Sequence, residues 1–221
     1  MQKIILILVL QLAALCSFAQ LKGSGKTIAK TYDYKNFDKV YFEDLDGKLE
    51  VEIGKAFSIN VIIDDNLEGL LSVTQSSPEH VLKVSFKNNR KNKLYIEETH
   101  FKIKITMPEA SVIRNNGNSG LIVSGLFGRY FRIENIENGS ATLDGAVDAL
   151  DIINQGNGSI NAKQLIAKKA KITCAGNGNV IVAVFDAITA KISGNGSVKN
   201  VGKARFDSNS STSGNGNLIN P

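Results

Sequence analysis

Five copies of one turn sequence read Glu137-Asn-Gly-Ser140, Gly156-Asn-Gly-Ser159, Gly176-Asn-Gly-Asn179, Gly194-Asn-Gly-Ser197 and Gly214-Asn-Gly-Asn217. The second glycines are Gly139, Gly158, Gly178, Gly196 and Gly216, at intervals of 19, 20, 18 and 20 residues. A period near 20 with a glycine turn in each copy is typical of a solenoid, in which each repeat stacks on the previous one.

The residues around these turns alternate between apolar and polar types. Counted from the first glycine of the turn, the positions two, four and six residues earlier and four residues later are mostly apolar or small. They are Asn154, Cys174, Ile192 and Thr212; Ile152, Ile172, Ala190 and Ser210; Leu150, Ala170, Ile188 and Ser208; and Ile160, Val180, Val198 and Leu218. Alternation with period two predicts strands with one buried face. Separate Asn-Gly hairpins are disfavoured, because they would not repeat the same inward columns at this spacing.

The sequence therefore predicts an all-β fold, a right-handed parallel β-helix with coils of about 20 residues. Stacked coils place equivalent side chains about 4.8 Å apart. The turn asparagines should then form a ladder of amides that hydrogen bond along the axis. The ladder residues are Asn157, Asn177, Asn195 and Asn215. The last coil, residues 208–221, is poor in apolar residues and is expected to cap the stack.

The N-terminal part of the chain, residues 20–108, is β-rich but lacks the repeat, which occupies residues 109–221. Apolar or alternating segments at 40–42, 49–53, 57–63, 81–86, 94–96 and 101–105 predict its strands. The stretch 66–72 predicts a short helical turn, and residues 115–120 are interpreted as the turn of the first coil. Wide coils and a small sandwich both remain open for this half.

Residues 1–19 have the pattern of a signal peptide. Lys3 supplies the positive start, an apolar run covers residues 4–15, and Ser17 and Ala19 are the small residues before the cleavage site. Lipidation at Cys16 is disfavoured by the bulky residue before it. No later segment is apolar enough to cross a membrane, so we expect an exported protein in the periplasm, at the cell surface or outside the cell.

Without Lys3 the chain has 25 Lys and Arg residues against 21 Asp and Glu, a net charge of about +4. The positive residues gather at 83–104 and 163–171, interleaved with acids or apolar positions. This interleaving favours a solvated β surface over a polyanion-binding patch, and no nucleic-acid partner is expected. Cys174 is the only cysteine after the signal peptide, so an internal disulfide is excluded and a small buried side chain is expected.

Residues with catalytic or metal-binding chemistry are sparse. His80 and His100 are the only histidines, and the nucleophile-elbow motif is absent. Asp144, Asp148 and Asp151 stand at unequal repeat positions, unlike the carboxylate cluster of a polysaccharide-active β-helix. The start of a calcium loop at 44–47 lacks its completing glutamate, and residues 37–47 are interpreted instead as the approach of a hairpin. We expect neither an enzyme nor a bound metal or cofactor.

The chain resembles the head GIN domain family, described as putative auto-transporter adhesins. The resemblance rests on the signal peptide, on the stretch from Phe37 through Asp64-Asp-Asn-Leu67 to Met107-Pro108, and on the serial Gly-Asn-Gly turns. It implies a secreted or envelope bacterial protein with a right-handed β-helix and no established catalytic residues. More distantly, the chain resembles the β-solenoid sensor modules of cell-envelope stress systems.

The leading functional hypothesis is a non-enzymatic binding or adhesion protein of the cell envelope, with a rigid repetitive surface for a carbohydrate or for a protein of the envelope or host. The predicted contact row beside the turns is Ser159, Asn179, Ser197 and Asn217. The alternative is a periplasmic structural or envelope-stress sensing module that acts through protein partners. A polysaccharide-active enzyme is the least favoured hypothesis. The choice between a monomer and an end-to-end homodimer remains open.

Overall fold

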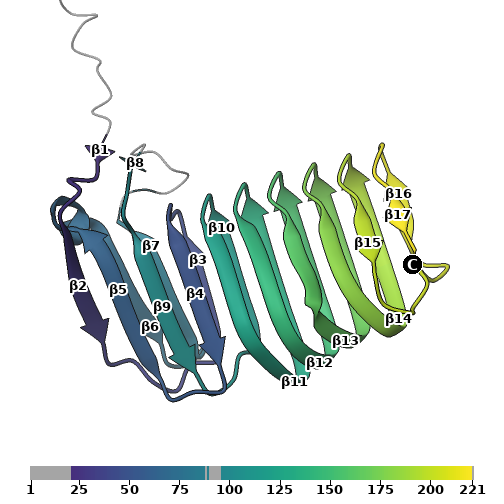
Figure 1. Cartoon of the computed structure of the whole chain (residues 1–221), viewed down its shortest axis with the longest axis horizontal. Helices are drawn as coiled ribbons and strands as arrows, with labels where there is room; N and C mark the ends of the chain where they lie inside the picture. The colour runs from purple at the N-terminus through teal and green to yellow at the C-terminus, as the bar shows by residue number, and fades with distance from the viewer. Residues whose placement is uncertain (1–20, 88, 90–95, 221) are drawn as a thin grey trace, which may run out of the picture.

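The computed structural model describes residues 21–87, 89 and 96–220, which form an elongated stack of β coils (Figure 1). The predicted signal peptide with Cys16, part of the strand predicted at 94–96 and Pro221 lie outside these residues. Across the described chain, no helix has both the length and the apolar character needed to cross a membrane.

Among its described residues, the N-terminal half contains nine strands and one short helix. The strands are β1 (Leu21–Lys22), β2 (Thr27–Tyr32), β3 (Lys39–Glu43), β4 (Lys48–Ile53), β5 (Ser58–Asp64), β6 (Leu71–Ser76), β7 (Val81–Phe86), β8 (Ile96–Glu97) and β9 (Lys102–Met107). The helix is the 3-10 helix η1 (Asp65–Leu70), close to the helical turn predicted at 66–72. It ends earlier than predicted because β6 begins at Leu71.

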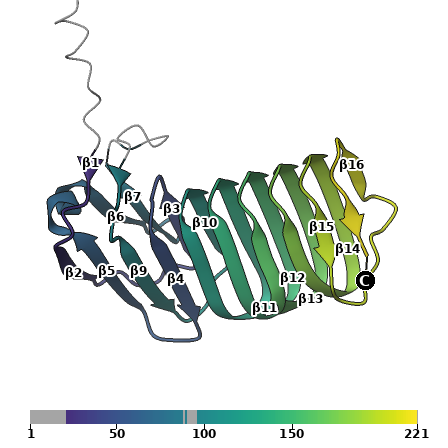
Figure 2. The ribbon, with the colours of Figure 1, turned by 45° about the horizontal axis from the view of Figure 1, so that its top comes forward.

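The repeat half is a β-solenoid, which confirms the predicted β-helix. Its strands are β10 (Val112–Gly117), β11 (Gly120–Glu137), β12 (Ser140–Gly156), β13 (Ile160–Gly176), β14 (Val180–Gly194), β15 (Val198–Asn200), β16 (Ser211–Ser213) and β17 (Leu218–Ile219). Neighbouring coils pair in parallel, from β10 through β14 and on to the short strands of the last coil. The long strands β11 to β14 bend around the core, so that each contributes to more than one side of its coil (Figure 2).

Equivalent positions of successive repeats lie opposite one another. Gly156 pairs with Gly176, and Gly176 pairs with Gly194. The first glycines of these turns have φ between 105° and 118°, a region that side chains with a Cβ rarely adopt. The inward columns are buried through β12, β13 and β14, where none of their residues is more than 8% exposed. The alternation in the sequence thus predicts the side of each strand that meets the core.

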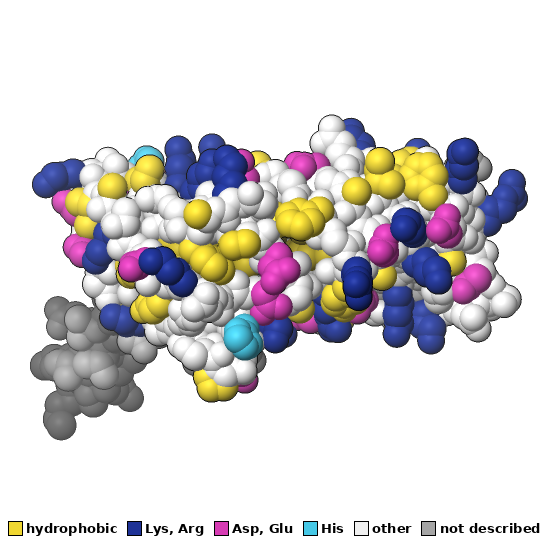
Figure 3. Space-filling model, turned by 90° about the horizontal axis from the view of Figure 1, so that it is seen from below, with side chains coloured by type: hydrophobic (Ala, Val, Ile, Leu, Met, Phe, Trp, Pro, Cys, Tyr) yellow, Lys and Arg dark blue, Asp and Glu magenta, His cyan; other side chains and the backbone are white. Residues whose placement is uncertain are grey.

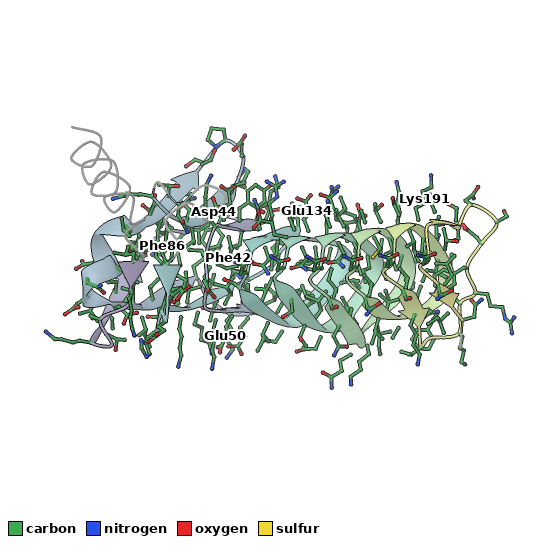
Figure 4. The ribbon with its side chains drawn as sticks, turned by 90° about the horizontal axis from the view of Figure 1, so that it is seen from above. Phe42, Asp44, Glu50, Phe86, Glu134 and Lys191 are labelled. Atoms are coloured by element: carbon green, nitrogen blue, oxygen red, sulfur yellow. The ribbon has the colours of Figure 1, made fainter. Side chains whose placement is uncertain are left out.

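The N-terminal half continues the coils of the solenoid. β3 pairs in parallel with β10 on one side of the coil, while β4 pairs in parallel with β11 on another. β7 pairs with β3 and β9 pairs with β4 to add a further coil, and β2, β5 and β6 close this end with antiparallel pairs. Phe42 and Phe86 point into the core, whereas Glu50 points outward (Figure 4).

The predicted hairpin approach at 37–47 is wrong, because 44–47 is a bend after which β4 pairs with β9 and β11, whereas β3 pairs with β7 and β10. Asp44 N donates to Asn116 O at 2.7 Å, and Gly120 N donates to Gly47 O at 3.2 Å. This bend therefore stacks on the turn at 117–120 as a coil turn without the Gly-Asn-Gly sequence. The coil at 115–120 is for this reason not the first of the stack, because the β3–β4 and β7–β9 coils lie beyond it.

Asp64 ties the segment before β2 to the body of the protein. Its fully buried carboxylate accepts hydrogen bonds from Gly25 N at 2.9 Å and His100 N at 2.7 Å. The Nδ1 atom of His100 lies 3.1 Å from Asp64 Oδ1. Nearby, Asn66 Oδ1 accepts a hydrogen bond from Ser24 N at 3.0 Å. The N-terminal segment is thus held by polar contacts to the end of β5 and the start of η1.

We expect Asp64→Asn to make the stability of this end less dependent on pH. Burial raises the pKa of Asp64, but the hydrogen bonds from His100 and Gly25 outweigh it and leave the pKa below its ordinary value. The ionised carboxylate therefore stabilises the fold above about pH 4, and this contribution is lost as the pH falls through the lowered pKa. Urea unfolding should show a loss of about 2 kcal/mol for the variant at neutral pH and a far smaller loss near pH 2.

The matched control for this experiment is Asp33→Asn, which changes an exposed carboxylate whose one ion pair within the described chain is with Lys35, at 2.9 Å. Exposed pairs contribute little, so its unfolding free energy should stay close to that of the parent at both pH values. A loss for Asp64→Asn that stays the same size in acid would contradict the assigned role of the buried carboxylate.

Candidate functional site

The turn asparagines form a continuous amide ladder along one outer edge. Donor–acceptor distances of 2.7 to 3.2 Å connect Asn118, Asn138, Asn157, Asn177, Asn195 and Asn215. From Asn138 onward, each Nδ2 atom donates to the Oδ1 atom of the asparagine one coil nearer the N-terminus. An amide has two N–H donors and two oxygen lone pairs, so within the ladder each side chain keeps hydrogen-bonding capacity for solvent or a ligand.

A second polar ladder lies inside the core, and the sequence interpretation did not identify it. Its members are Asn115, Asn135, Asn154 and Cys174, each no more than 1% exposed. Each side chain donates to the carbonyl oxygen four residues later, at 2.6 to 3.1 Å, and so fastens its own turn from within. Burial raises the pKa of the Cys174 thiol, only partly offset by the contact with Asn154, so the thiol is a structural group here.

The predicted contact row lies beside the outer ladder. Ser159, Asn179 and Asn217 are exposed, while Ser197 is half-buried. Ser159 Oγ accepts a hydrogen bond from Asn179 N at 3.1 Å, and Asn179 Oδ1 accepts one from Ser197 N at 2.9 Å. Part of the polar capacity of this row is therefore used to join neighbouring coils.

The second glycines of the turns lie against the backbone of the preceding coil. A Cβ atom would come within 2.1 Å of a carbonyl oxygen of the preceding coil at Gly158, Gly178, Gly196 and Gly216, and within 2.7 Å of Ser119 O at Gly139. These positions set the spacing of the coils and leave no room for a ligand.

A chain of ion pairs crosses the outer face of β10 to β12. Glu134, at 10% side-chain exposure, lies 2.6 Å from Arg114 Nε and 2.8 Å from Arg132 Nε (Figure 4). Arg132 Nη1 lies 3.4 Å from Asp151 Oδ2, the atom that also accepts a hydrogen bond from the Tyr130 hydroxyl at 3.4 Å. Partial burial and the nearby Asp151 raise the pKa of Tyr130, which keeps its hydroxyl protonated. The network thus holds the Tyr130 ring in place.

A shallow hollow of about 310 Å³ adjoins this network on β11 to β14. Ala149 and Ala187 contribute small side chains to it, Tyr130 stands at one end, and Lys169 lies between the two alanines in the register. Lys171 and Thr189 line the neighbouring outward row. Tyr130 remains 45% exposed. None of these residues was predicted as a site, although Lys169 and Lys171 belong to the basic cluster noted at 163–171.

The histidines and aspartates considered for chemistry are engaged separately. Asp144 accepts a hydrogen bond from Gly125 N at 2.9 Å, Asp148 pairs with Lys168 at 2.7 Å, and Asp151 belongs to the arginine network. His80 Nδ1 lies 3.1 Å from Asn36 O, and His100 contacts Asp64. Within residues 21–87, 89 and 96–220, no group of three or more His, Cys, Asp or Glu side chains is placed to hold a metal ion.

A family model described as "Putative auto-transporter adhesin, head GIN domain" matches residues 36–204. The chain belongs to the head GIN domain family. This confirms the resemblance found in the sequence. The match includes the hollow, the inner ladder and all but the last Gly-Asn-Gly turn. A search of curated proteins finds no match.

Solved structures share the fold of this head GIN domain. A putative adhesin from Bacteroides fragilis superposes with a TM-score of 0.67 at 21% identity, covering 91% of this chain and 100% of that chain. A putative adhesin from Parabacteroides merdae gives 0.56 at 18% identity, with 91% and 98% covered. A putative lipid binding protein from Parabacteroides distasonis gives 0.51 at 21% identity, with 91% and 99% covered. At these identities the similarity shows a common architecture.

Proposed function

We propose that this head GIN domain is an exported, non-enzymatic binding protein that holds a carbohydrate or protein ligand against the outer surface of its β-helix. The observation that carries the proposal is the hollow beside Tyr130, which combines an exposed aromatic ring, a floor of small apolar side chains and polar side chains at its margin. Such a combination is typical of ligand sites. The adhesin description of the family and of two structural relatives supports a binding role.

A rigid surface favours such binding, because little conformational entropy is lost when the ligand binds. Both amide ladders, the parallel pairing of the coils and the ion pairs of Glu134 restrain the backbone and the side chains around the hollow. Tyr130 is held from the side by Asp151, which is itself held by Arg132. The site would therefore be preformed before the ligand arrives.

The hollow is the favoured contact surface, and the row beside the turns is the second one. In that row, Ser159 and Asn179 already accept backbone hydrogen bonds from the next coil. A ligand there would compete with contacts that stabilise the stack. In the hollow, Tyr130 is 45% exposed, and its hydrogen bond to Asp151 uses the hydroxyl and leaves the ring itself for a ligand.

The first experiment is to screen the chain from Gln20 onward against glycan and matrix-protein arrays and to compare two variants on every ligand found. Tyr130→Ala should weaken binding about tenfold, because aromatic contacts contribute on the order of 1 kcal/mol beyond their buried area. A variant with Trp at positions 159, 179 and 197 should leave binding in the hollow unchanged. Circular dichroism melts of both variants serve as the control for folding.

An array without any bound ligand would overturn the proposed function. If only the tryptophan variant loses binding, the ligand lies on the row beside the turns, as the sequence alone predicts. Antibody labelling of intact and permeabilised cells tests the proposed export. Labelling of intact cells is expected for adhesion, whereas labelling only after permeabilisation would favour the periplasmic structural or sensing module.

A further inference from the structure

The margin of the hollow carries two positive charges without partners. Lys169 and Lys171 are exposed, and neither side chain forms a hydrogen bond or ion pair with another described residue. Their neighbours differ in this respect, because Lys168 pairs with Asp148 at 2.7 Å and Arg132 pairs with Asp151 at 3.4 Å. Asp151 also lines the hollow but is paired with Arg132, so Lys169 and Lys171 are two unpaired charges at its margin.

The geometry places these two charges on the same side of one strand. Lys169 and Lys171 are two residues apart on β13, so their side chains leave the same face with Cα atoms about 6.6 Å apart. Tyr130 occupies the same outward row as Lys169 but two coils away, with Ala149 between them in the register. Two coil spacings correspond to about 9.6 Å. The aromatic ring and the ammonium groups can thus contact successive units of one extended chain.

The floor of the hollow matches a sugar ring better than a purely ionic ligand. In the row of Tyr130, the small apolar side chains of Ala149 and Ala187 lie on either side of Lys169, and Ala149 is next to the tyrosine. A pyranose ring has a flat face of C–H groups that packs against an aromatic ring, while its substituents reach polar groups at the margin. At the far end, Thr189 Oγ1 donates to Asp207 Oδ2 at 2.5 Å, so this hydroxyl is already engaged.

We propose that the hollow binds an acidic polysaccharide, with Tyr130 packed on a sugar ring and Lys169 and Lys171 paired with the carboxylates of uronate residues. This inference rests on the proposed function and specifies its ligand. It assigns to the cluster at 163–171 the polyanion-binding role that the sequence pattern disfavoured. A carboxylate gains a charge-assisted hydrogen bond from each ammonium group, whereas a neutral sugar gains only the ring contact.

The surrounding charges oppose a nucleic acid as the ligand. Lysine and arginine side chains on the underside of the molecule, where β11 to β14 bend, lie among acidic and apolar side chains (Figure 3). Nucleic-acid binding surfaces instead have a basic patch or stripe that follows many phosphates. Two lysines beside one aromatic ring fit a short acidic segment.

The test is isothermal titration calorimetry of the chain from Gln20 onward with hexagalacturonate at low salt. A neutral gluco-oligosaccharide of equal length should bind at least ten times more weakly. The double variant Lys169→Gln/Lys171→Gln should lose at least tenfold in affinity for hexagalacturonate, and Tyr130→Ala should lose a similar factor. Tyr130→Phe should keep most of the affinity, because it retains the ring.

The matched control is Lys48→Gln/Lys102→Gln. These lysines are also exposed, lie opposite each other on β4 and β9, and form no aromatic contact or ion pair with any residue that the structure describes. Removing them lowers the net charge by the same amount, so binding should stay within about twofold of the parent, since screened charges outside the site contribute little. Equal losses in both double variants would overturn the inference by showing a net-charge effect.

Two further outcomes separate this inference from the proposed function. Binding of neutral glycans through Tyr130, unaffected by Lys169→Gln/Lys171→Gln, would overturn the acidic ligand and leave the binding function standing. Equal affinity for a single-stranded oligonucleotide would overturn the sugar specificity. Failure to bind hexagalacturonate, together with an array free of any ligand, would overturn both.

Discussion

Gly178→Ala is expected to lower the free energy of unfolding by about 3 kcal/mol, a large share of the total for a typical domain. A Cβ atom at this position would lie 1.8 Å from Gly158 O and 2.7 Å from the side-chain Nδ2 atom of Asn154. The first of these atoms belongs to the backbone of the preceding coil, which cannot move aside without changing the coil spacing. The clash therefore propagates into the parallel pairing, and urea unfolding measures the loss.

Gly120→Ala is the matched control for this prediction. Gly120 also follows a turn of the solenoid and begins β11, but the atom nearest to a Cβ placed there, Ser140 Oγ, lies 4.0 Å away. Its unfolding free energy should change by less than about 1 kcal/mol. Similar losses at both positions would show that close coil contact is not the reason for glycine in these turns.

Asn135→Leu is expected to cost about 2 to 3 kcal/mol, whereas Asn177→Ala should cost less than about 1 kcal/mol. Asn135 is completely buried and donates to Gly139 O at 2.6 Å and Asn154 Oδ1 at 2.9 Å. The leucine would leave both acceptors without these donors inside the core. Asn177 belongs to the exposed ladder, where water replaces the lost hydrogen bonds.

The chain itself provides evidence that size is not the problem in the Asn135 variant. Ile192 stands in the same inward column and is 3% exposed, so an apolar side chain fits this column. The expected loss therefore measures the buried hydrogen bonds. In thermal and urea unfolding, Asn135→Leu should lose far more unfolding free energy than Asn177→Ala. Equal losses would contradict the distinction between the inner and outer ladders.

The repeat half could be predicted from the sequence because its determinants are local. A Gly-Asn-Gly turn needs residues that accept positive φ, and Gly156 and Gly176 have φ of 105° and 111°. Alternation on either side of the turn distinguishes the buried face from the exposed face without knowledge of the partner strand. The pattern alone accordingly places residues such as Ile152 and Ile172 in the core, and both are 1% exposed or less.

The N-terminal coils could not be predicted in the same way. The bend at 44–47 lacks the Gly-Asn-Gly sequence of the later turns, so it could not be aligned with them as a coil turn. The β3–β4 coil also stacks between β10–β11 and β7–β9, out of chain order. Its strands pair with segments far away in the chain, and strand pairing between distant segments leaves no short-range signal.

The candidate site, too, could be predicted from the sequence only in part. The residues of the hollow stand at the same distance before each turn, so Tyr130, Ala149, Lys169 and Ala187 could be aligned as one row. Alignment does not reveal a hollow, because the strands bend there and the register shifts between Thr142 and Asp144 and between Ala167 and Lys169. β-bulges of this kind reorient side chains locally.

The sequence by itself determined the coil period, the positions of the turns, the buried columns and the family of this protein. Each of these follows from short-range constraints, namely glycine conformation and strand alternation, repeated often enough to be unambiguous. Only the tertiary structure decided how the first coils stack, that the buried asparagines form a ladder, and that Lys169 and Lys171 are left unpaired beside Tyr130. These features depend on which side chains of separate coils meet, and that is set by strand bends and by pairing between residues far apart in the chain.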